Sequence, residues 1–195
     1  CLLSRGLGDV YKRQLYRYMS GNVLAGNIDE FDGAYMMARL VDYIVEHLSQ
    51  QIKAGCDTVQ VFDSWASDLG EEHIIPYCYE PTAQIVERLR ALHPDVGIIV
   101  FPRLIGEEIN NFSKYVNADC ISLSDDMKTD WILKRMGSQC LQGGIPPQVL
   151  LSERKEEIIR GTVPMIRQMK DCAYVVNLAH GINKETPVEL SLIHI

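Results

Sequence analysis

Five short runs of apolar residues, rich in valine and isoleucine, recur along the chain with room for a helix between them. Most positions in each run are apolar instead of alternating strictly with polar ones, which predicts strands covered on both faces, as in a parallel sheet. The expected strands are residues 58–62, 97–101, 120–123, 139–142 and 174–178.

The intervening segments place apolar residues three and four positions apart, which is the spacing of an amphipathic helix. Gly55 is a suitable stop for the helix before the first strand, and the next helix should end before Pro94. Pro164 should kink or divide the last helix. The expected helices are residues 37–52, 85–92, 109–116, 131–136 and 158–169.

This order of elements, one helix followed by alternating strands and helices, predicts an α/β fold with parallel strands and right-handed crossovers. No Gly/Ser linker or charged block divides the chain, so we expect one domain. Two architectures fit: an open doubly wound sheet, or part of a (βα)8 barrel. A complete barrel takes about 250 residues, and periodicity alone does not decide between the two.

The ends of the chain can be encoded by one DNA segment and its reverse complement. Asp9 as GAT is the reverse complement of Ile195 as ATC, and the remaining codons of residues 9–14 and 190–195 pair in the same way. The implied DNA resembles the transposase end sequence used to prepare sequencing libraries. We therefore expect residues 1–14 and 190–195 to be tag-derived, and residues 15–189 to be a natural segment whose gene continues past both tags.

The composition is that of a globular protein, with 47% hydrophobic and 23% charged residues among 195. A net charge of −7 argues against a nucleic-acid binder, and no apolar stretch approaches the roughly 18–20 residues of a membrane span. The natural segment has an odd number of cysteines and no C-x-x-C pair, and the N-terminus lacks the shape of a signal peptide. These features favour a reducing cytoplasm and give little support to a metal site.

Polar residues follow the expected strands at the ends where parallel α/β proteins place their function. The first strand leads into Asp63-Ser64, the second into Arg103, and the fifth into His180 before a glycine. Ser64 could instead cap the following segment, and Arg103 could be a solvated or ion-paired charge. His180 could equally be a structural hydrogen bonder or a ligand contact.

The third and fourth expected strands also end in polar or flexible residues. Asp125 and Asp126 fit turn and cap positions, so their adjacency does not establish acid–base chemistry. Gly143 and Gly144 permit close approach of a ligand. They do not form a phosphate-binding motif, because neither G-x-G-x-x-G nor Gly-Lys-Ser/Thr follows.

Several phrases, in this order along the chain, resemble the uroporphyrinogen decarboxylase family. The Phe-Asp-Ser-Trp and Asn-Leu-Ala-His-Gly phrases are specific together, at this separation, and the resemblance covers essentially all of residues 15–189. The phrases are residues 18–19, 51–57, 59–66, 141–143, 177–182 and 186–187.

The resemblance implies a (βα)8 barrel of which this segment supplies strands four to eight. It implies a cytosolic homodimer that decarboxylates the four acetate side chains of uroporphyrinogen to give coproporphyrinogen, in haem and tetrapyrrole synthesis, without a metal or organic cofactor. Protonation of a pyrrole carbon would make the ring its own electron sink, so that CO2 can leave. The protein would orient acetates, stabilise charge and manage protons.

By position in these phrases, Tyr18, Ser64 and His180 match the family's substrate-binding residues. Tyr18 matches the tyrosine that hydrogen-bonds near the reacting acetate, and the other two match contacts to substrate carboxylates. The family often has Asn at the position of Gly144 and Asp at that of Pro146, and residues 124–126 also depart from its pattern. These departures suggest a divergent branch.

The family's arginine-bearing segment and the strand with its key aspartate are not in this sequence. The main proton-handling group is therefore expected to be missing, and we expect no turnover by the chain alone. Two alternatives stay open. A zinc-dependent corrinoid or thiol methyltransferase of the same superfamily should show His-x-Cys at a strand end, which is absent. The second alternative is a noncatalytic binding or scaffold protein that is naturally short, and not a truncated enzyme.

Overall fold

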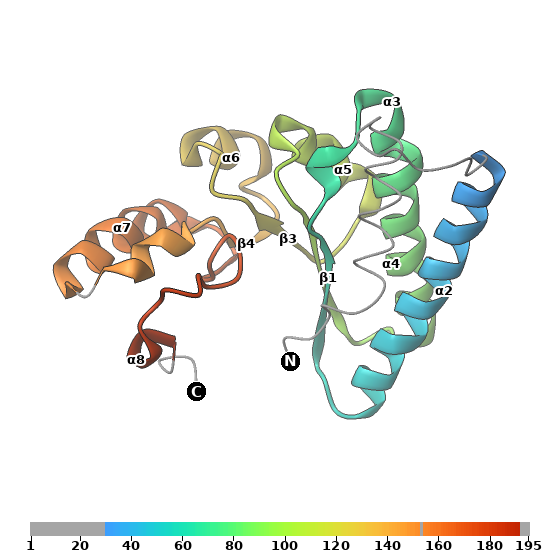
Figure 1. Cartoon of the computed structure of the whole chain (residues 1–195), viewed down its shortest axis with the longest axis horizontal. Helices are drawn as coiled ribbons and strands as arrows, with labels where there is room; N and C mark the ends of the chain where they lie inside the picture. The colour runs from blue at the N-terminus through green and yellow to red at the C-terminus, as the bar shows by residue number, and fades with distance from the viewer. Residues whose placement is uncertain (1–29, 153, 192–195) are drawn as a thin grey trace. The chain divides into compact units, whose positions relative to one another are not determined.

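The computed structural model describes residues 30–152 and 154–191, which belong to two compact units (Figure 1). The first unit ends at Asp119 and the second begins at Cys120. Tyr18 and the expected tag residues 1–14 lie outside the described residues, as do residues 192–195.

The first unit contains two strands and the helices around them. Their order is α2 (Glu30–Lys53), β1 (Thr58–Asp63), η1 (Ala66–Asp68), α3 (Glu71–Ile74), η2 (Ile75–Tyr79), α4 (Glu80–Leu92), β2 (Gly97–Pro102), η3 (Gly106–Glu108) and α5 (Ile109–Val116).

Strands β1 and β2 pair in parallel over their whole length, from Thr58 opposite Gly97 to Asp63 opposite Pro102. Both strands therefore end at the same edge, and the loops after them lie next to each other. Helix α2 packs against α4 and β1 (Figure 1).

One stripe of α2 is buried, as its sequence spacing predicts. Met37, Val41, Val45 and Leu48 are all buried, whereas Tyr43 on the same helix is 64% exposed. The spacing of these four residues is that of one helix face. Most helix stability in proteins comes from packing of one face and not from intrinsic helix propensity. Burial of this stripe is therefore the main stabilisation of α2.

The second unit contains three parallel strands. Its elements are β3 (Cys120–Leu123), α6 (Thr129–Met136), β4 (Cys140–Gly143), η4 (Pro147–Leu151), α7 (Lys155–Gln168), η5 (Met169–Asp171), β5 (Tyr174–Val175) and α8 (Val188–Ser191). β4 pairs with β3 on one side and with β5 on the other.

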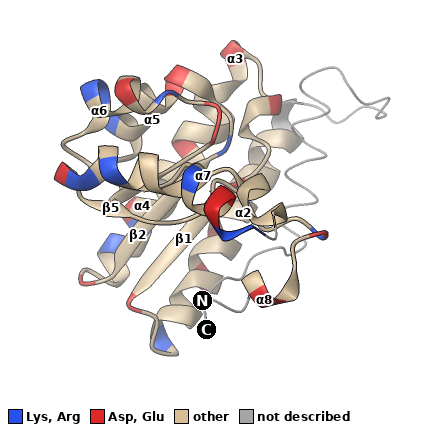
Figure 2. Cartoon of the chain, turned by 90° about the vertical axis from the view of Figure 1, so that its left-hand side faces the viewer, with Lys and Arg blue, Asp and Glu red and all other residues tan. Residues whose placement is uncertain are grey.

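The described strands confirm the expected α/β fold, with strands and helices alternating along the chain. Within each unit, every strand pair joins strands that are consecutive in sequence, namely β1–β2, β3–β4 and β4–β5. A barrel pairs consecutive strands in this way, whereas a doubly wound sheet reverses its strand order partway. The pairing is therefore consistent with a partial barrel. The charged residues lie mainly on helices and loops, and β2 carries none (Figure 2).

The last strand is shorter than the expected run 174–178. β5 ends at Val175, and Leu178 makes only an isolated bridge to Ile145. The reason lies in residues 143–144, where φ angles of 78° and 86° turn the neighbouring strand aside and interrupt the ladder. The apolar run alone does not reveal this interruption.

Pro164 does not divide helix α7, which continues through it from Lys155 to Gln168. Proline removes one backbone donor from a helix and crowds the preceding turn. Pro164 is exposed, so its ring faces solvent and not a packed neighbour.

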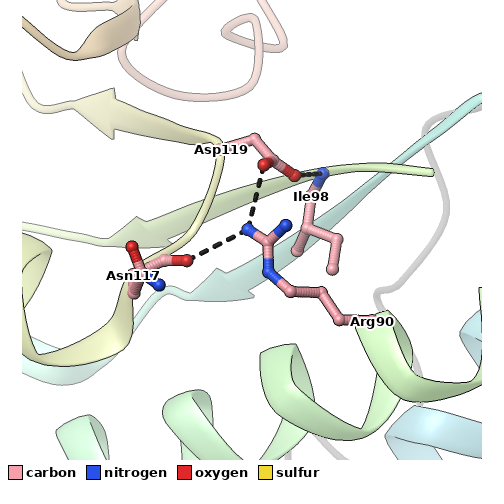
Figure 3. Close-up of polar contacts among 4 residues, drawn as sticks. All are labelled: Arg90, Ile98, Asn117 and Asp119. Atoms are coloured by element: carbon pink, nitrogen blue, oxygen red, sulfur yellow. Dashed lines mark hydrogen bonds and ion pairs between the residues drawn. The ribbon is translucent and has the colours of Figure 1, made fainter. Parts of the chain in front are cut away.

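A polar cluster fastens the start of β2 in the first unit (Figure 3). Arg90 at the end of α4 donates to the Asn117 carbonyl at 3.0 Å and to Asp119 Oδ1 at 2.9 Å. The other carboxylate oxygen of Asp119 accepts the backbone N–H of Ile98 at 2.8 Å. The Ile98 carbonyl in turn accepts the Asp119 backbone N–H at 3.1 Å.

This cluster predicts unequal effects of removing its two charges. Asp119→Ala leaves the N–H of the buried Ile98 without its acceptor and should lower the free energy of unfolding by about 1–2 kcal/mol. Arg90→Ala removes a half-exposed ion pair and should cost about 0.5 kcal/mol. Urea unfolding curves measure both, with the exposed Asp95→Ala as control. An Arg90→Ala loss larger than that of Asp119→Ala would contradict this account.

Candidate functional site

Ser64 lies directly after β1, at the strand end where α/β proteins place their function. It is half-buried, and the preceding Asp63 is buried. The Asp63 carbonyl accepts the backbone N–H of Arg103 at 3.0 Å, so the residues following β1 and β2 are adjacent. Ser64 is not the cap of the next segment, because η1 begins after Trp65 and no side chain caps it.

A cavity of about 550 Å³ opens between the loops that follow β1 and β2. Ser67 and Glu71 line it from one loop, and Leu104 and Glu108 line it from the other. Leu104 has a φ of 57°, a left-handed conformation that is uncommon for leucine. Two carboxylates, those of Glu71 and Glu108, line this cavity, so its lining does not favour acidic ligands.

Hydrogen bonds fix the Glu108 side chain at this cavity. Tyr79 donates its hydroxyl to the Glu108 carboxylate and backbone carbonyl, both at 3.0 Å, and Asn111 donates to the same carboxylate oxygen at 3.2 Å. Burial, followed by the Glu108 hydrogen bond, raises the pKa of Tyr79 well above its usual value. Tyr79 therefore remains a neutral donor. It also packs edge-on against Phe112, with ring centroids 5.2 Å apart.

In the second unit, other atoms of the protein lie close to Gly143 at the end of β4 and to Gly144 directly after it. A Cβ on Gly143 would stand 3.2 Å from the Leu178 carbonyl, and one on Gly144 would clash with the end of the Met165 side chain. The groups closest to these two glycines are thus the chain's own, and the approach of a ligand there stays a prediction. Gly144 also has a φ of 86°, a left-handed conformation that favours glycine.

The turn after β4 is held from β5 by Tyr174, whose hydroxyl donates to the Gly143 carbonyl at 2.6 Å. Burial raises the pKa of Tyr174 to about 12. On the other side of β4, Gln142 donates to the Ser122 hydroxyl of β3 at 3.3 Å, and both side chains are buried. These bonds join the ends of β3, β4 and β5.

The raised pKa of Tyr174 predicts a loss of stability at high pH. The unfolded phenol ionises near pH 10, whereas the folded phenol keeps its proton to about pH 12, so the stabilisation present below pH 10 is lost between these values. Tyr174→Phe should cost about 1 kcal/mol at pH 8 and should reduce the decline between pH 8 and pH 11. Urea unfolding at both pH values tests this, with the exposed Tyr35→Phe as control. An unchanged decline in Tyr174→Phe would be evidence against it.

His180 follows β5 and is exposed in the second unit. Its Nδ1 lies 3.4 Å from the Gly181 carbonyl, and with the proton on Nδ1 the ring donates to that oxygen. The preceding Ala179 is buried and donates its backbone N–H to the Ile145 carbonyl at 2.7 Å. The segment is thus anchored just before His180, whose ring stays accessible to a ligand.

The three sequence-predicted binding residues are distributed over the chain. Ser64 belongs to the first unit and His180 to the second, and each follows a strand of its unit as expected. Tyr18 precedes the described residues. The contact between Tyr79 and Glu108 was not predicted, because it joins residues 29 positions apart and no motif marks either one.

Within the ranges 30–152 and 154–191, no group of three or more His, Cys, Asp and Glu side chains could hold a metal ion. No helix in the described part of the chain is long and apolar enough to cross a membrane.

The sequence of this chain is similar to that of one known protein family. The family model described as uroporphyrinogen decarboxylase (URO-D) matches residues 29–191. A uroporphyrinogen decarboxylase of Cereibacter sphaeroides is 31% identical over 156 residues, covering 79% of this chain and 45% of that protein. Relatives with the same name come from Orientia tsutsugamushi, at 34% over 150 residues (77% and 44%), and from Paracoccus denitrificans, at 32% over 157 residues (80% and 46%).

The chain thus spans about half the length of the curated relatives that it matches. The match includes the loops after β1 and β5, with Ser64 and His180. This chain belongs to the uroporphyrinogen decarboxylase family.

Proposed function

We propose that the longer protein to which this chain belongs removes the carboxyl groups of the four acetate side chains of uroporphyrinogen and so forms coproporphyrinogen. The observation that carries the proposal is the family match over residues 29–191, which includes polar residues at the strand ends. We further propose that this protein acts in the cytoplasm as a homodimer, and that it needs no metal or organic cofactor.

In this proposal Ser64 and His180 bind carboxylates of the substrate. A hydroxyl can donate to a carboxylate oxygen, and a protonated imidazole adds charge to its hydrogen bond. The strand ends support both roles, because Ser64 does not cap η1 and the His180 ring is accessible. Tyr18 is proposed to hydrogen-bond near the reacting acetate.

The chemistry requires a proton on a pyrrole carbon, which lets the ring accept the electron pair of the breaking C–CO2 bond. Tyr18, Ser64 and His180 orient the acetates and stabilise their charge, while the group that handles the proton belongs to the part of the protein outside this chain. Binding the substrate in a fixed orientation lowers the activation barrier of decarboxylation, because the entropy cost of orienting the acetates is met on binding.

Substitutions in the longer protein test these roles. Ser64→Ala should raise KM for uroporphyrinogen about tenfold, the value of one charge-assisted hydrogen bond, and His180→Ala should raise it at least as much. Ser138→Ala, an exposed serine before β4, is the matched control. Anaerobic assays of coproporphyrinogen give both kinetic constants. Unchanged kinetics in Ser64→Ala and His180→Ala would refute the binding roles.

We also propose that residues 1–14 and 190–195 derive from inserted DNA, with residues 15–189 as the natural segment. Uninterrupted genomic reads across codons 9–14 and 190–195 should depart from the tag sequence. Genomic DNA that runs through these codons unchanged would reject this origin.

A further inference from the structure

Two cysteines of the second unit lie opposite each other on neighbouring strands. Cys120 begins β3, Cys140 begins β4, and the two are direct partners in the parallel ladder. Both are thiols in this structure. Neighbouring strands lie about 4.7–4.9 Å apart, which is within the Cα separation of about 4.4–6.8 Å that a disulfide spans.

The side chains of this pair project from the same face of the sheet. Two residues further along, Ser122 and Gln142 are also direct partners, and their side chains meet at 3.3 Å. Because side chains alternate along a strand, those of Cys120 and Cys140 lie on that same face.

The two thiols differ in access to solvent. Cys120 is 4% exposed, whereas Cys140 is half-buried. An oxidant therefore reaches Cys140 first, and Cys120 is placed to attack the oxidised sulfur from within. Only one helical crossover separates the two positions, so little chain entropy opposes the link.

We propose that Cys120 and Cys140 form a thiol-oxidation site that a peroxide converts to a reversible disulfide. The Cys140 thiolate attacks hydrogen peroxide, forming an S–O bond and releasing hydroxide. The Cys120 thiol then attacks this sulfenic sulfur, forming the S–S bond as the departing oxygen takes up the Cys120 thiol proton and leaves as water, while the proton of the Cys140 thiol neutralises the hydroxide released first. Two thiols are oxidised and one peroxide is reduced.

The separation of paired residues on parallel strands should make this disulfide easy to reduce. Direct partners on parallel strands hold their Cβ atoms near the strand spacing, which exceeds the usual disulfide separation of about 3.8 Å. Such strain makes a bond easier to reduce. Thioredoxin or dithiothreitol should therefore restore the thiols.

Cys172 provides a matched control. It is half-buried and precedes β5, where the Leu141 N–H donates to the Ala173 carbonyl at 2.8 Å. This pairing sets Ala173 beside Cys140 and turns the neighbouring Cys172 to the opposite face. A site chosen by exposure alone would use Cys172 as readily as Cys120.

The test treats the reduced 195-residue chain with one equivalent of hydrogen peroxide and then alkylates the remaining thiols. Mass spectrometry should show the loss of two hydrogens, a tryptic peptide pair joined through Cys120 and Cys140, and an about tenfold fall in Cys140 alkylation. Cys172→Ser should keep the link, whereas Cys120→Ser should leave a sulfenic acid on Cys140 that dimedone captures.

A link between Cys140 and Cys172, or sulfinic acid on Cys140 of the wild type without the joined peptides, would overturn the proposal. A trivalent arsenical tests the same pair without any substitution, because it bridges only two adjacent thiols. It should protect Cys120 and Cys140 from alkylation together, and protection of neither would also overturn the proposal.

Discussion

Purified chain 1–195 should form no detectable coproporphyrinogen from uroporphyrinogen under anaerobic conditions. The chain spans about 45% of the Cereibacter sphaeroides relative. The arginine-bearing segment and the aspartate strand expected from the family are not in its sequence. Removal of one principal charge-stabilising group typically costs about 10²–10³ in kcat, which is enough to bring product below detection.

The positive control for this assay is the uroporphyrinogen decarboxylase of Paracoccus denitrificans, which is 32% identical over the shared part. The negative control is the His180→Ala variant of the chain. Product from the wild-type chain above that of His180→Ala would show that residues 1–195 suffice for catalysis, which would contradict the account.

Phe112→Ala should lower the free energy of unfolding more than Asp119→Ala, Arg90→Ala or Tyr174→Phe. Phe112 is 1% exposed and contacts the Tyr79 ring that supports the cavity wall. Loss of a buried phenylalanine costs about 3–5 kcal/mol, from the transfer of the ring and the cavity it leaves. Amide hydrogen exchange should show reduced protection in α4, α5 and β2.

The matched control is Tyr115→Ala. Tyr115 also approaches the Tyr79 ring, at 5.6 Å, but it is 49% exposed and should cost less than about 1 kcal/mol. Phe112→Leu, which keeps most of the apolar volume, should fall between the two. Equal losses in Phe112→Ala and Tyr115→Ala would show that the buried Phe112 ring does not support this part of the first unit.

The periodicity of the chain predicts much of this fold because local spacing and burial agree. The run at residues 120–123 is strand β3, and residues 109–116 form α5. The disagreement at β5 comes from residues 143–144, whose positive φ angles depend on tertiary packing. The short helices between Glu71 and Tyr79 also escaped prediction, because that segment has no sustained apolar period.

The candidate site is predictable only where a rule links sequence position to geometry. Ser64 and His180 were expected to follow strands, and within its own unit each does: Ser64 directly follows β1, and His180 lies in the segment after β5. No such rule predicts that Glu108 would be fixed by Tyr79, or that Met165 would occupy the space beside Gly144. Both depend on contacts between residues distant in sequence.

The most direct test of the account is turnover by the longer protein, expressed from the reading frame extended upstream. Incubated anaerobically with uroporphyrinogen, it should yield coproporphyrinogen and four CO2 per substrate, and His180→Ala should raise its KM. Uroporphyrinogen that remains unchanged, with the Paracoccus denitrificans enzyme active in a parallel incubation, would contradict the proposed decarboxylase function.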